Sequence, residues 1–444
     1  MLRDLRPLRV IQSADAAWIE VVADEKDRVD RILLMDAKHA RAKCRVCRAG
    51  IADDQQSKMI LVNRQVFRGK KLRREKKRDR QHFAIINIED ERKMNGVAQT
   101  AATGVALRAM RKIALLVALA SATQLSAAYH VARHIAIGGT GGWDYPTVDS
   151  ASRRLFLSHS DRVDVVDIDH QKIVGSIPKT DGVHGIAIAS DLHRGFISNG
   201  RPSTMTIFDL DKLSTIAEVK TSGEGPDAIL YDPATKHVFT FNGRGHNASV
   251  FDGEGKVVGT IPLDGKPEFG VTDRAGHVFV NIEDKSELAD IDAKTLTVVH
   301  VWPLAPCEEP SGLAIDRAHH RLFSVCGNQK MVVTDSQSGK VIASVEIGKG
   351  VDGAAFDDDK QLAFSSNGAD GTLTVVREVS PNEFSVVENV PTARGARTIA
   401  LDEKTHDIFL PTAKFGPPPA PTPDRPRPRP TILPDSFEVI EVAP

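Results

Sequence analysis

From residue 138 onward, the hydrophobic positions fall in short runs of about five to eight residues, which is the length of typical β-strands. The runs are rich in Val, Ile, Phe and Thr, and Gly, Asp and Asn separate them. In "MTIFDLD" (205–211) apolar and polar residues alternate, as in a strand with one buried face. Helical periodicity is suggested only by the apolar run near residue 113 and by residues 24–38. The pattern therefore predicts an all-β fold.

The strand pattern repeats with a period of about 40 residues, which indicates a propeller or a solenoid. Each copy starts with a turn and a short apolar strand that ends near Asp, as in "PDAILYD", "PSGLAID" and "VDGAAFD". The equivalent first-strand positions are 144, 184, 227, 268, 311, 352 and 397, so the successive gaps are 40, 43, 41, 43, 41 and 45 residues. Four strands in each of seven copies predict a seven-bladed β-propeller over residues 129–444.

The ends of this region predict how the ring closes. The seventh copy finishes at the C-terminus with "SFEVIEVAP", which supplies a third strand but no fourth. Residues 130–139, "HVARHIAIGG", match the fourth-strand pattern of the other copies. We therefore expect this strand to become the outer strand of the last blade. The Pro-rich residues 415–430 interrupt the seventh copy, and we expect an exposed, extended loop there, with a docking segment as the alternative.

Residues 110–128, "MRKIALLVALASATQLSAA", have the basic start, apolar run and small-residue end of a secretory signal peptide. The apolar run is far shorter than the roughly 20 residues that a membrane helix needs, so no membrane span is expected. A signal peptide works at the start of a chain, and we expect translation to begin at Met110. Residues 1–109 are then an unstructured extension from an upstream start choice. These features predict a periplasmic or secreted protein.

Charge separates the same two regions. Residues 1–109 hold 25 basic and 15 acidic residues, whereas residues 110–444 hold 33 basic and 44 acidic residues. The run "RGKKLRREKKRDR" (68–80) allows a second interpretation of the extension, as a basic module that binds nucleic acid or a membrane. That run has no interleaved aromatic residues and no surrounding binding motif, so nucleic acid remains an unsupported partner.

Three copies resemble a known repeat. The strand ends "FISN", "FTFN" and "FSSN", followed by "MTIFD", "ASVFD" and "LTVV", resemble the YVTN repeats of the YncE-like bacterial β-propellers. The other copies are degenerate at these positions. The resemblance covers about residues 130–444 and implies the fold, but it implies no particular chemistry. The Gly-His and Trp-Asp pattern of WD40 repeats does not recur, and three Trp residues suit a tryptophan-docked quinoprotein poorly.

A propeller places the start of each first strand and the end of each second strand on one face, around the central channel. The sequence therefore predicts two sets of side chains at one channel mouth. The first set is Asp144, His184, Asp227, Glu268, Ser311, Asp352 and Arg397. The second set is His159, Asn199, Asn242, Ile282, Cys326, Asn367 and Thr412.

The first set offers the ligands of a divalent metal. Carboxylates with Asn oxygens suit a hard cation, and a His among carboxylates suits a transition metal or acid–base chemistry. The candidate metal ligands are Asp144, His184, Asp227, Glu268 and Asp352. The alternative is a solvated channel mouth, with Asn residues that cap turns or adopt left-handed backbone. The sequence indicates no other cofactor and assigns no catalytic residue.

Two cysteines predict a disulfide. Cys307 precedes the first strand of the fifth copy and Cys326 ends its second strand, so both are expected on one face. In an oxidising compartment such a pair is expected to form a disulfide. The alternative is a free thiol near the channel.

The sequence favours a monomeric binding protein whose polar channel mouth, or the loops around it, takes a protein, peptide, glycan or small molecule. The alternative is a metal-assisted, lactonase-like hydrolase in which His184 and its neighbours activate water. The sequence leans against an enzyme, because it has no serine nucleophile elbow, no HExxH helix and no phosphate-binding glycine loop. A haem-attachment CxxCH motif is also absent, which argues against electron transfer.

Overall fold

The computed structural model describes residues 9–13, 16–23, 28–35, 59–66, 84–85, 128–422, 428 and 430–444. The chain divides into two units, Met1–Thr123 and Gln124–Pro444. The predicted signal peptide lies outside the described residues except for its last residue, and so does the basic run at 68–80. Among the residues that the structure describes, no helix is both long and apolar enough to cross a membrane.

The first unit contains one antiparallel sheet in the strand order β1-β2-β3-β4-β5. Its strands are β1 (Arg9–Ser13), β2 (Ala16–Ala23), β3 (Arg28–Met35), β4 (Met59–Val66) and β5 (Ala84–Ile85). The helical tendency of residues 24–38 is wrong, because β3 occupies most of that stretch. Its "RVDRILLM" sequence pairs along its whole length with β4, and these sheet contacts outweigh a weak local preference.

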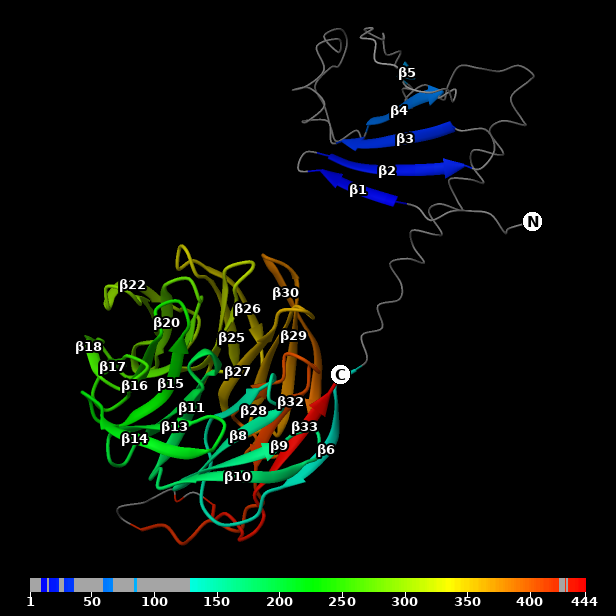
Figure 1. Ribbon diagram of the computed structural model, residues 1–444. Helices are drawn as coiled ribbons and strands as arrows, with labels where there is room; N and C mark the ends of the chain where they lie inside the picture. Colours follow the sequence, from blue (N-terminus) through cyan, green and yellow to red (C-terminus); the bar gives the residue numbers. More distant parts are fainter. Residues whose placement is uncertain are drawn as a thin grey trace. The chain divides into compact units, whose positions relative to one another are not determined.

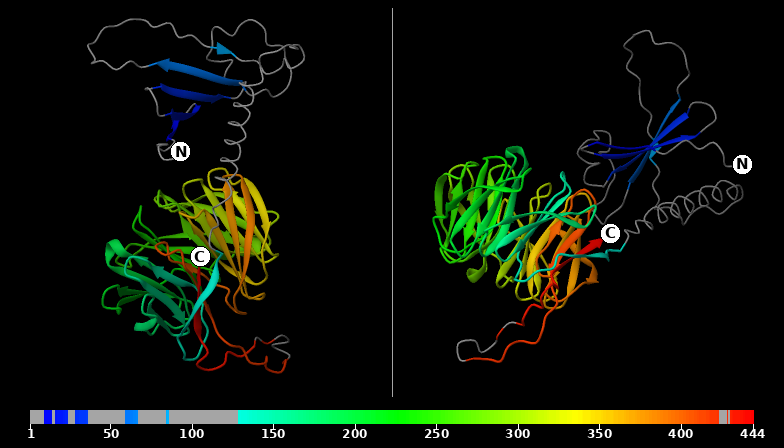
Figure 2. Two further views of the ribbon diagram at one scale, coloured as in Figure 1. Left: turned by 90° about the vertical axis from the view of Figure 1, so that its right-hand side faces the viewer. Right: turned by 60° about the horizontal axis from the view of Figure 1, so that its bottom comes forward.

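The second unit consists of seven four-stranded antiparallel sheets arranged as a propeller, which confirms the predicted fold (Figures 1 and 2). Blade one has β7 (Pro146–Asp149), β8 (Arg154–His159), β9 (Arg162–Asp167) and β10 (Lys172–Pro178). Blade two has β11 (Val183–Ala189), β12 (Arg194–Asn199), β13 (Thr204–Asp209) and β14 (Ser214–Lys220). Blade three has β15 (Pro226–Asp232), β16 (His237–Asn242), β17 (Asn247–Phe251) and β18 (Val257–Pro262).

The next three blades follow the same order. Blade four has β19 (Pro267–Thr272), β20 (His277–Ile282), β21 (Glu287–Asp292) and β22 (Thr297–Pro303). Blade five has β23 (Pro310–Asp316), β24 (Arg321–Cys326), β25 (Lys330–Asp335) and β26 (Val341–Glu346). Blade six has β27 (Val351–Asp357), β28 (Leu362–Asn367), β29 (Thr372–Ser380) and β30 (Glu383–Pro391). Two short 3₁₀ turns, η1 (Ser190–Leu192) and η2 (Glu283–Lys285), lie in blades two and four.

Blade seven closes the ring with strands from both ends of the propeller unit. It contains β31 (Ala400–Leu401), β32 (Ile408–Thr412), β33 (Glu438–Ala443) and, as its outer strand, β6 (His130–Ala136). β6 is antiparallel to β33, and Val439 lies opposite Ile135 in the register. Figure 1 shows the red C-terminal strand beside the cyan β6. The predicted closure is therefore confirmed.

Hydrophobic clusters between adjacent sheets hold the blades together. Phe156 of blade one packs against Phe208 of blade two with ring centroids 5.9 Å apart, and both side chains are fully buried. Another cluster joins blade seven to blade one through Ile135, Leu157 and Phe409. A single sheet cannot bury both of its faces, so each blade depends on its two neighbours.

Glycine allows the innermost strands to approach closely around the channel. Gly312 is the third residue of β23, and Gly353 is the third residue of β27. A Cβ atom on Gly312 would lie 2.7 Å from the backbone of Gly353 and Ala354, closer than van der Waals contact allows. This absence of a side chain brings the starts of neighbouring first strands together and positions the channel residues described next.

Residues 413–437 form a loop between β32 and β33, and its described parts run largely without regular pairing. One isolated bridge joins Phe415 to Ile432. The base of the loop packs on blade one, because Trp143 stacks on Phe437 at 5.4 Å and contacts Phe415 at 6.1 Å. Residues 423–427 and 429, within the predicted Pro-rich loop, lie outside the described residues.

Candidate functional site

The structure brings the first predicted set of side chains together at the start of the innermost strands. His184, Asp227, Glu268, Ser311 and Asp352 are each the second residue of their strand. Asp144 and Arg397 precede β7 and β31, the first strands of blades one and seven. We call these seven residues the channel ring.

One side of the channel ring groups an imidazole with two carboxylates. His184 Nδ1 lies 2.6 Å from Asp144 Oδ2 and 3.4 Å from Asp227 Oδ1. One ligand atom of each residue lies within 4.8 Å of the other two, which is close enough for a shared metal ion. The Asp227 carboxylate is the least satisfied of the three, because His184 is its only charged contact and no donor bonds to it among the described residues.

On the other side, a guanidinium connects three blades. Arg397 Nε donates to Asp352 Oδ2 at 2.7 Å, and Arg397 Nη2 contacts Asp144 Oδ1 at 3.3 Å. Ser311 Oγ donates to the second oxygen of Asp352 at 2.7 Å. The guanidinium also lies 6.0 Å from the ring centre of Trp143, within range of a cation–π interaction. Arg397 therefore neutralises part of the carboxylate charge and fixes blades six, seven and one.

Two residues that the sequence did not indicate complete the ring near Glu268. Lys266 Nζ lies 2.8 Å from Glu268 Oε2 and also pairs with Glu283. Tyr145 donates from its hydroxyl to Glu268 Oε1 at 3.2 Å, although Tyr145 belongs to blade one and Glu268 to blade four. Tyr145 is buried and packs edge-on against Phe269, so its ring fills the channel behind the carboxylates. Neither residue occupies a repeated position, and no pattern in the sequence pointed to them.

Serine side chains on the second strands position the channel residues. Ser158 Oγ accepts a hydrogen bond from the Asp144 backbone N–H at 2.6 Å. The hydroxyl of Ser198 in blade two donates to the backbone carbonyl of Asp227 in blade three. Likewise, the hydroxyl of Ser366 in blade six donates to the backbone carbonyl of Arg397 in blade seven. The ring is therefore held by contacts between blades as well as within them.

Burial and mutual repulsion shift the acidity of the ring. Burial raises the pKa of Asp227 well above its ordinary value, and it also raises the pKa of Glu268 and Asp352. Burial alone would lower the pKa of His184, but its hydrogen bond to Asp144 and the nearby carboxylates outweigh burial and raise it to about 9. His184 is therefore charged at neutral pH.

The raised pKa of His184 predicts a pH-dependent stability. A folded-state pKa of about 9, against an ordinary value of 6.5, means that the stabilisation is complete below pH 6.5 and is lost as the pH rises towards 9. Allowing for solvent screening of a ring that is 36% exposed, we expect a loss of about 1 kcal/mol. Urea unfolding at pH 6 and pH 9 measures this loss.

His184→Gln should flatten the difference between the two pH values. His193→Gln, at a side chain that is 76% exposed, is the matched control and should keep the wild-type pH dependence. An unchanged pH dependence in His184→Gln would show that other groups control it.

The second predicted set does not face the channel, which corrects the expectation from sequence. Asn199, Asn242 and Asn367 are fully buried, and each donates to two side chains at the start of its blade's third strand. Asn199, for example, donates to Thr204 and Thr206 at 3.0 and 2.8 Å. These Asn side chains therefore lock the second and third strands together. Their recurrence has a structural explanation, as the alternative held, but it lies in these hydrogen bonds between strands and not in left-handed backbone.

The remaining members of that set are also buried. His159 Nδ1 lies 2.7 Å from Asp164 Oδ2, and the ring packs on Phe437 at 4.6 Å. Its Nε2 atom is buried and has no hydrogen-bond partner among the described residues. Ile282 and Thr412 are buried in blades four and seven, and Thr412 donates to the Arg394 carbonyl.

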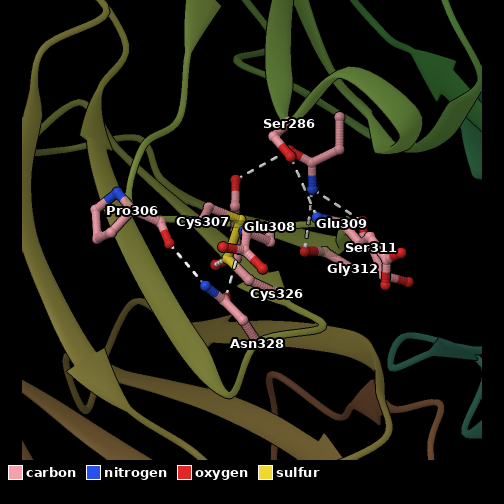
Figure 3. The surroundings of a disulfide bond; sticks show 11 residues. Ser286, Pro306, Cys307, Glu308, Glu309, Ser311, Gly312, Cys326 and Asn328 are labelled. Carbon is pink, nitrogen blue, oxygen red and sulfur yellow. Dashed lines mark hydrogen bonds between the residues drawn. A yellow bond between two sulfur atoms is a disulfide. The ribbon is translucent and has the colours of Figure 1, made fainter.

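Cys307 and Cys326 form a disulfide in blade five, with Cα atoms 5.4 Å apart (Figure 3). It connects the segment before β23 to the end of β24. Asn328 adds a parallel connection, because its Nδ2 donates to the Pro306 carbonyl at 2.8 Å. Both sulfurs are buried, so neither is a free thiol at the channel.

Comparison with known proteins supports the fold. No protein-family profile matches the chain, and no curated protein matches it by sequence. Among solved structures, the chain resembles Kuenenia stuttgartiensis hydrazine synthase, with 16% identity and a TM-score of 0.55 over 61% of this chain and 92% of that one. It also resembles U3-55K (9% identity, TM-score 0.58) and the RRP9 WD40 repeats (9% identity, TM-score 0.59), each over 71% of this chain and 98% of the other.

At these identities the likeness shows a shared β-propeller architecture and nothing of shared chemistry. The chain is a seven-bladed β-propeller, and it is similar in fold to WD40 and other propeller proteins.

Proposed function

We propose that this chain is an exported binding protein of the YVTN-like type, and that its channel ring binds a positively charged group of a partner. The excess of carboxylates carries the proposal. Four carboxylates belong to the ring, against one imidazolium and one guanidinium, and the added Lys266 is balanced by Glu283. Within the described part of the chain, no side chain or backbone N–H donates to the Asp227 carboxylate, which is 21% exposed. An incoming ammonium or guanidinium would supply that donor.

Two features support export. The segment at 110–128 has the composition of a signal peptide, and the disulfide of blade five suits an oxidising compartment. On this proposal, N-terminal sequencing of the exported protein starts near residue 128 and finds none of residues 1–109.

The binding test uses calorimetry to follow a hexalysine peptide and a hexaglutamate peptide against the exported protein, which on this proposal lacks the basic run at 68–80. We expect hexalysine to bind, hexaglutamate not to bind, and the affinity for hexalysine to fall as salt is added. Asp227→Asn should weaken hexalysine binding by about tenfold, which corresponds to about 1.4 kcal/mol.

Asp211→Asn is the matched control, because its side chain is 70% exposed and lies outside the ring. It should bind hexalysine like the wild type. Equal weakening by both variants would assign the binding to the general negative surface, and unchanged binding by Asp227→Asn would remove the ring from the proposal.

A metal-assisted, lactonase-like hydrolase is the second candidate, and the grouping of Asp144, His184 and Asp227 favours it. These residues offer two carboxylate oxygens and one imidazole nitrogen to a metal ion that could polarise a substrate carbonyl. Turnover of lactones that a chelator abolishes, with stoichiometric metal in the purified protein, would replace the binding function with this one.

A further inference from the structure

A second cluster of ionisable side chains lies between blades five and six, at the opposite ends of the innermost strands from the channel ring. One of its members, Asp316, has a structural role that recurs in other blades. The Asp residue that ends a first strand accepts hydrogen bonds from backbone N–H groups of the following turn. In blade five, Asp316 Oδ1 accepts from Ala318 and His319 at 2.8 and 3.2 Å. The second carboxylate oxygen is then available to a neighbour.

In three other blades, the next blade supplies a donor to this Asp. Thr272 donates to Asp232 at 2.6 Å, and His406 contacts Asp357 at 2.8 Å. Arg153 of blade one pairs with Asp402 of blade seven. Each of these contacts satisfies the buried carboxylate and connects adjacent blades.

Blade six instead presents a second carboxylate to Asp316. Glu378, near the end of β29, has a side chain that is 1% exposed, and among the described residues its carboxyl group faces only His319 and the carboxyl group of Asp316. His319 Nδ1 lies 2.6 Å from Asp316 Oδ2 and 3.0 Å from Glu378 Oε1, so one imidazole nitrogen faces both carboxylates. Burying two carboxylates beside each other is costly unless a cation joins them or one of them takes up a proton.

The nearest guanidinium does not supply that cation. Arg321 donates to Asp335 and to the carbonyl of Pro381, and it also contacts Asn382. Its N–H groups are thus directed to partners other than Glu378.

We propose that Asp316, His319 and Glu378 bind a divalent transition-metal ion that joins blades five and six. One ligand atom of each residue lies within 4.8 Å of the other two. An imidazole with two carboxylates suits an ion of the zinc or manganese type better than calcium, which prefers oxygen ligands alone. His319 is 38% exposed, which gives the ion a path from solvent and leaves room for water as a further ligand.

The test measures zinc binding to the full chain after treatment with EDTA and dialysis. All variants carry Cys44→Ala and Cys47→Ala, because those thiols could bind zinc themselves. Asp144→Asn removes the competing group at the channel ring. In this parent we expect one zinc ion per chain. Glu378→Gln and His319→Gln should each weaken binding by more than about tenfold, as expected when a metal site loses a ligand.

Thermal unfolding separates the loss of a ligand from misfolding. Zinc should raise the melting temperature of the parent but not that of Glu378→Gln. Without metal, Glu378→Gln should melt no lower than the parent, because an uncharged amide replaces one of two adjacent buried carboxyl groups. Zinc binding of equal strength in Glu378→Gln, or a parent that binds no zinc, would overturn the proposal.

Discussion

Deletion of residues 130–136 is expected to abolish cooperative unfolding of the propeller. These residues form β6, the outer strand of blade seven, and they tie the N-terminal end of the propeller unit to the blade that its C-terminal end forms. Without them, β33 has no neighbouring strand on its outer side. The hydrophobic cluster between blades seven and one also loses Ile135 and becomes exposed to water.

The expected loss is large compared with the stability of a domain. Ile135 is 2% exposed and is removed with the strand, which also holds the neighbouring Tyr129 against Phe364 at 5.2 Å. Burial of one such side chain contributes about 1.5–3 kcal/mol, whereas a whole domain is stable by about 5–15 kcal/mol. The lost strand pairing adds to this, so the remaining sheets should no longer unfold as one unit.

Chemical unfolding followed by tryptophan fluorescence and circular dichroism measures the effect. A point substitution, Ile135→Ala, should cost about 2–5 kcal/mol by creating a cavity. His134→Ala on the same strand, at a side chain that is 55% exposed, should change stability by no more than about 0.5 kcal/mol. A deletion variant with the wild-type transition would contradict the role of β6 in closure.

The repeat explains why the architecture was predictable from sequence. The period near 40 residues fixed the number of blades, and the missing fourth strand of the last copy required a partner from elsewhere in the chain. The channel ring followed from the same register, since equivalent residues at the start of the first strands must converge on the axis. For these features, local pattern and global fold agree.

The errors arose where contacts depend on side chains from different strands or blades. The sequence predicts that the repeated Asn residues face the channel, because the ends of the second strands lie at the channel mouth. However, the Asn of "FISN" is followed on the next strand by the hydroxyls of Thr204 and Thr206. This spacing indicates that Asn199 bonds to the neighbouring strand, and it was the available signal of a structural role. Glu378 gave no comparable signal. It lies beyond the usual end of the strand motif, and its proximity to Asp316 exists only after blades five and six have packed together.

The disulfide gives the second large expected effect. Reduction of the Cys307–Cys326 bond should lower the free energy of unfolding by about 3 kcal/mol, because a bond across 19 positions restricts the unfolded chain. The bond also fixes the segment that precedes β23. Ser311, the second residue of β23, belongs to the channel ring and donates a hydrogen bond to Asp352. Its loss should therefore loosen the ring as well as blade five.

Denaturant unfolding with and without dithiothreitol measures this effect. Cys307→Ala with Cys326→Ala should have a stability close to that of the reduced wild type, and dithiothreitol should not change it further. Cys44→Ala with Cys47→Ala is the matched control for other thiols and should keep the full response to reduction. If the wild type is equally stable with and without reductant, the bond contributes no stability and the link between this blade and an oxidising compartment loses its support.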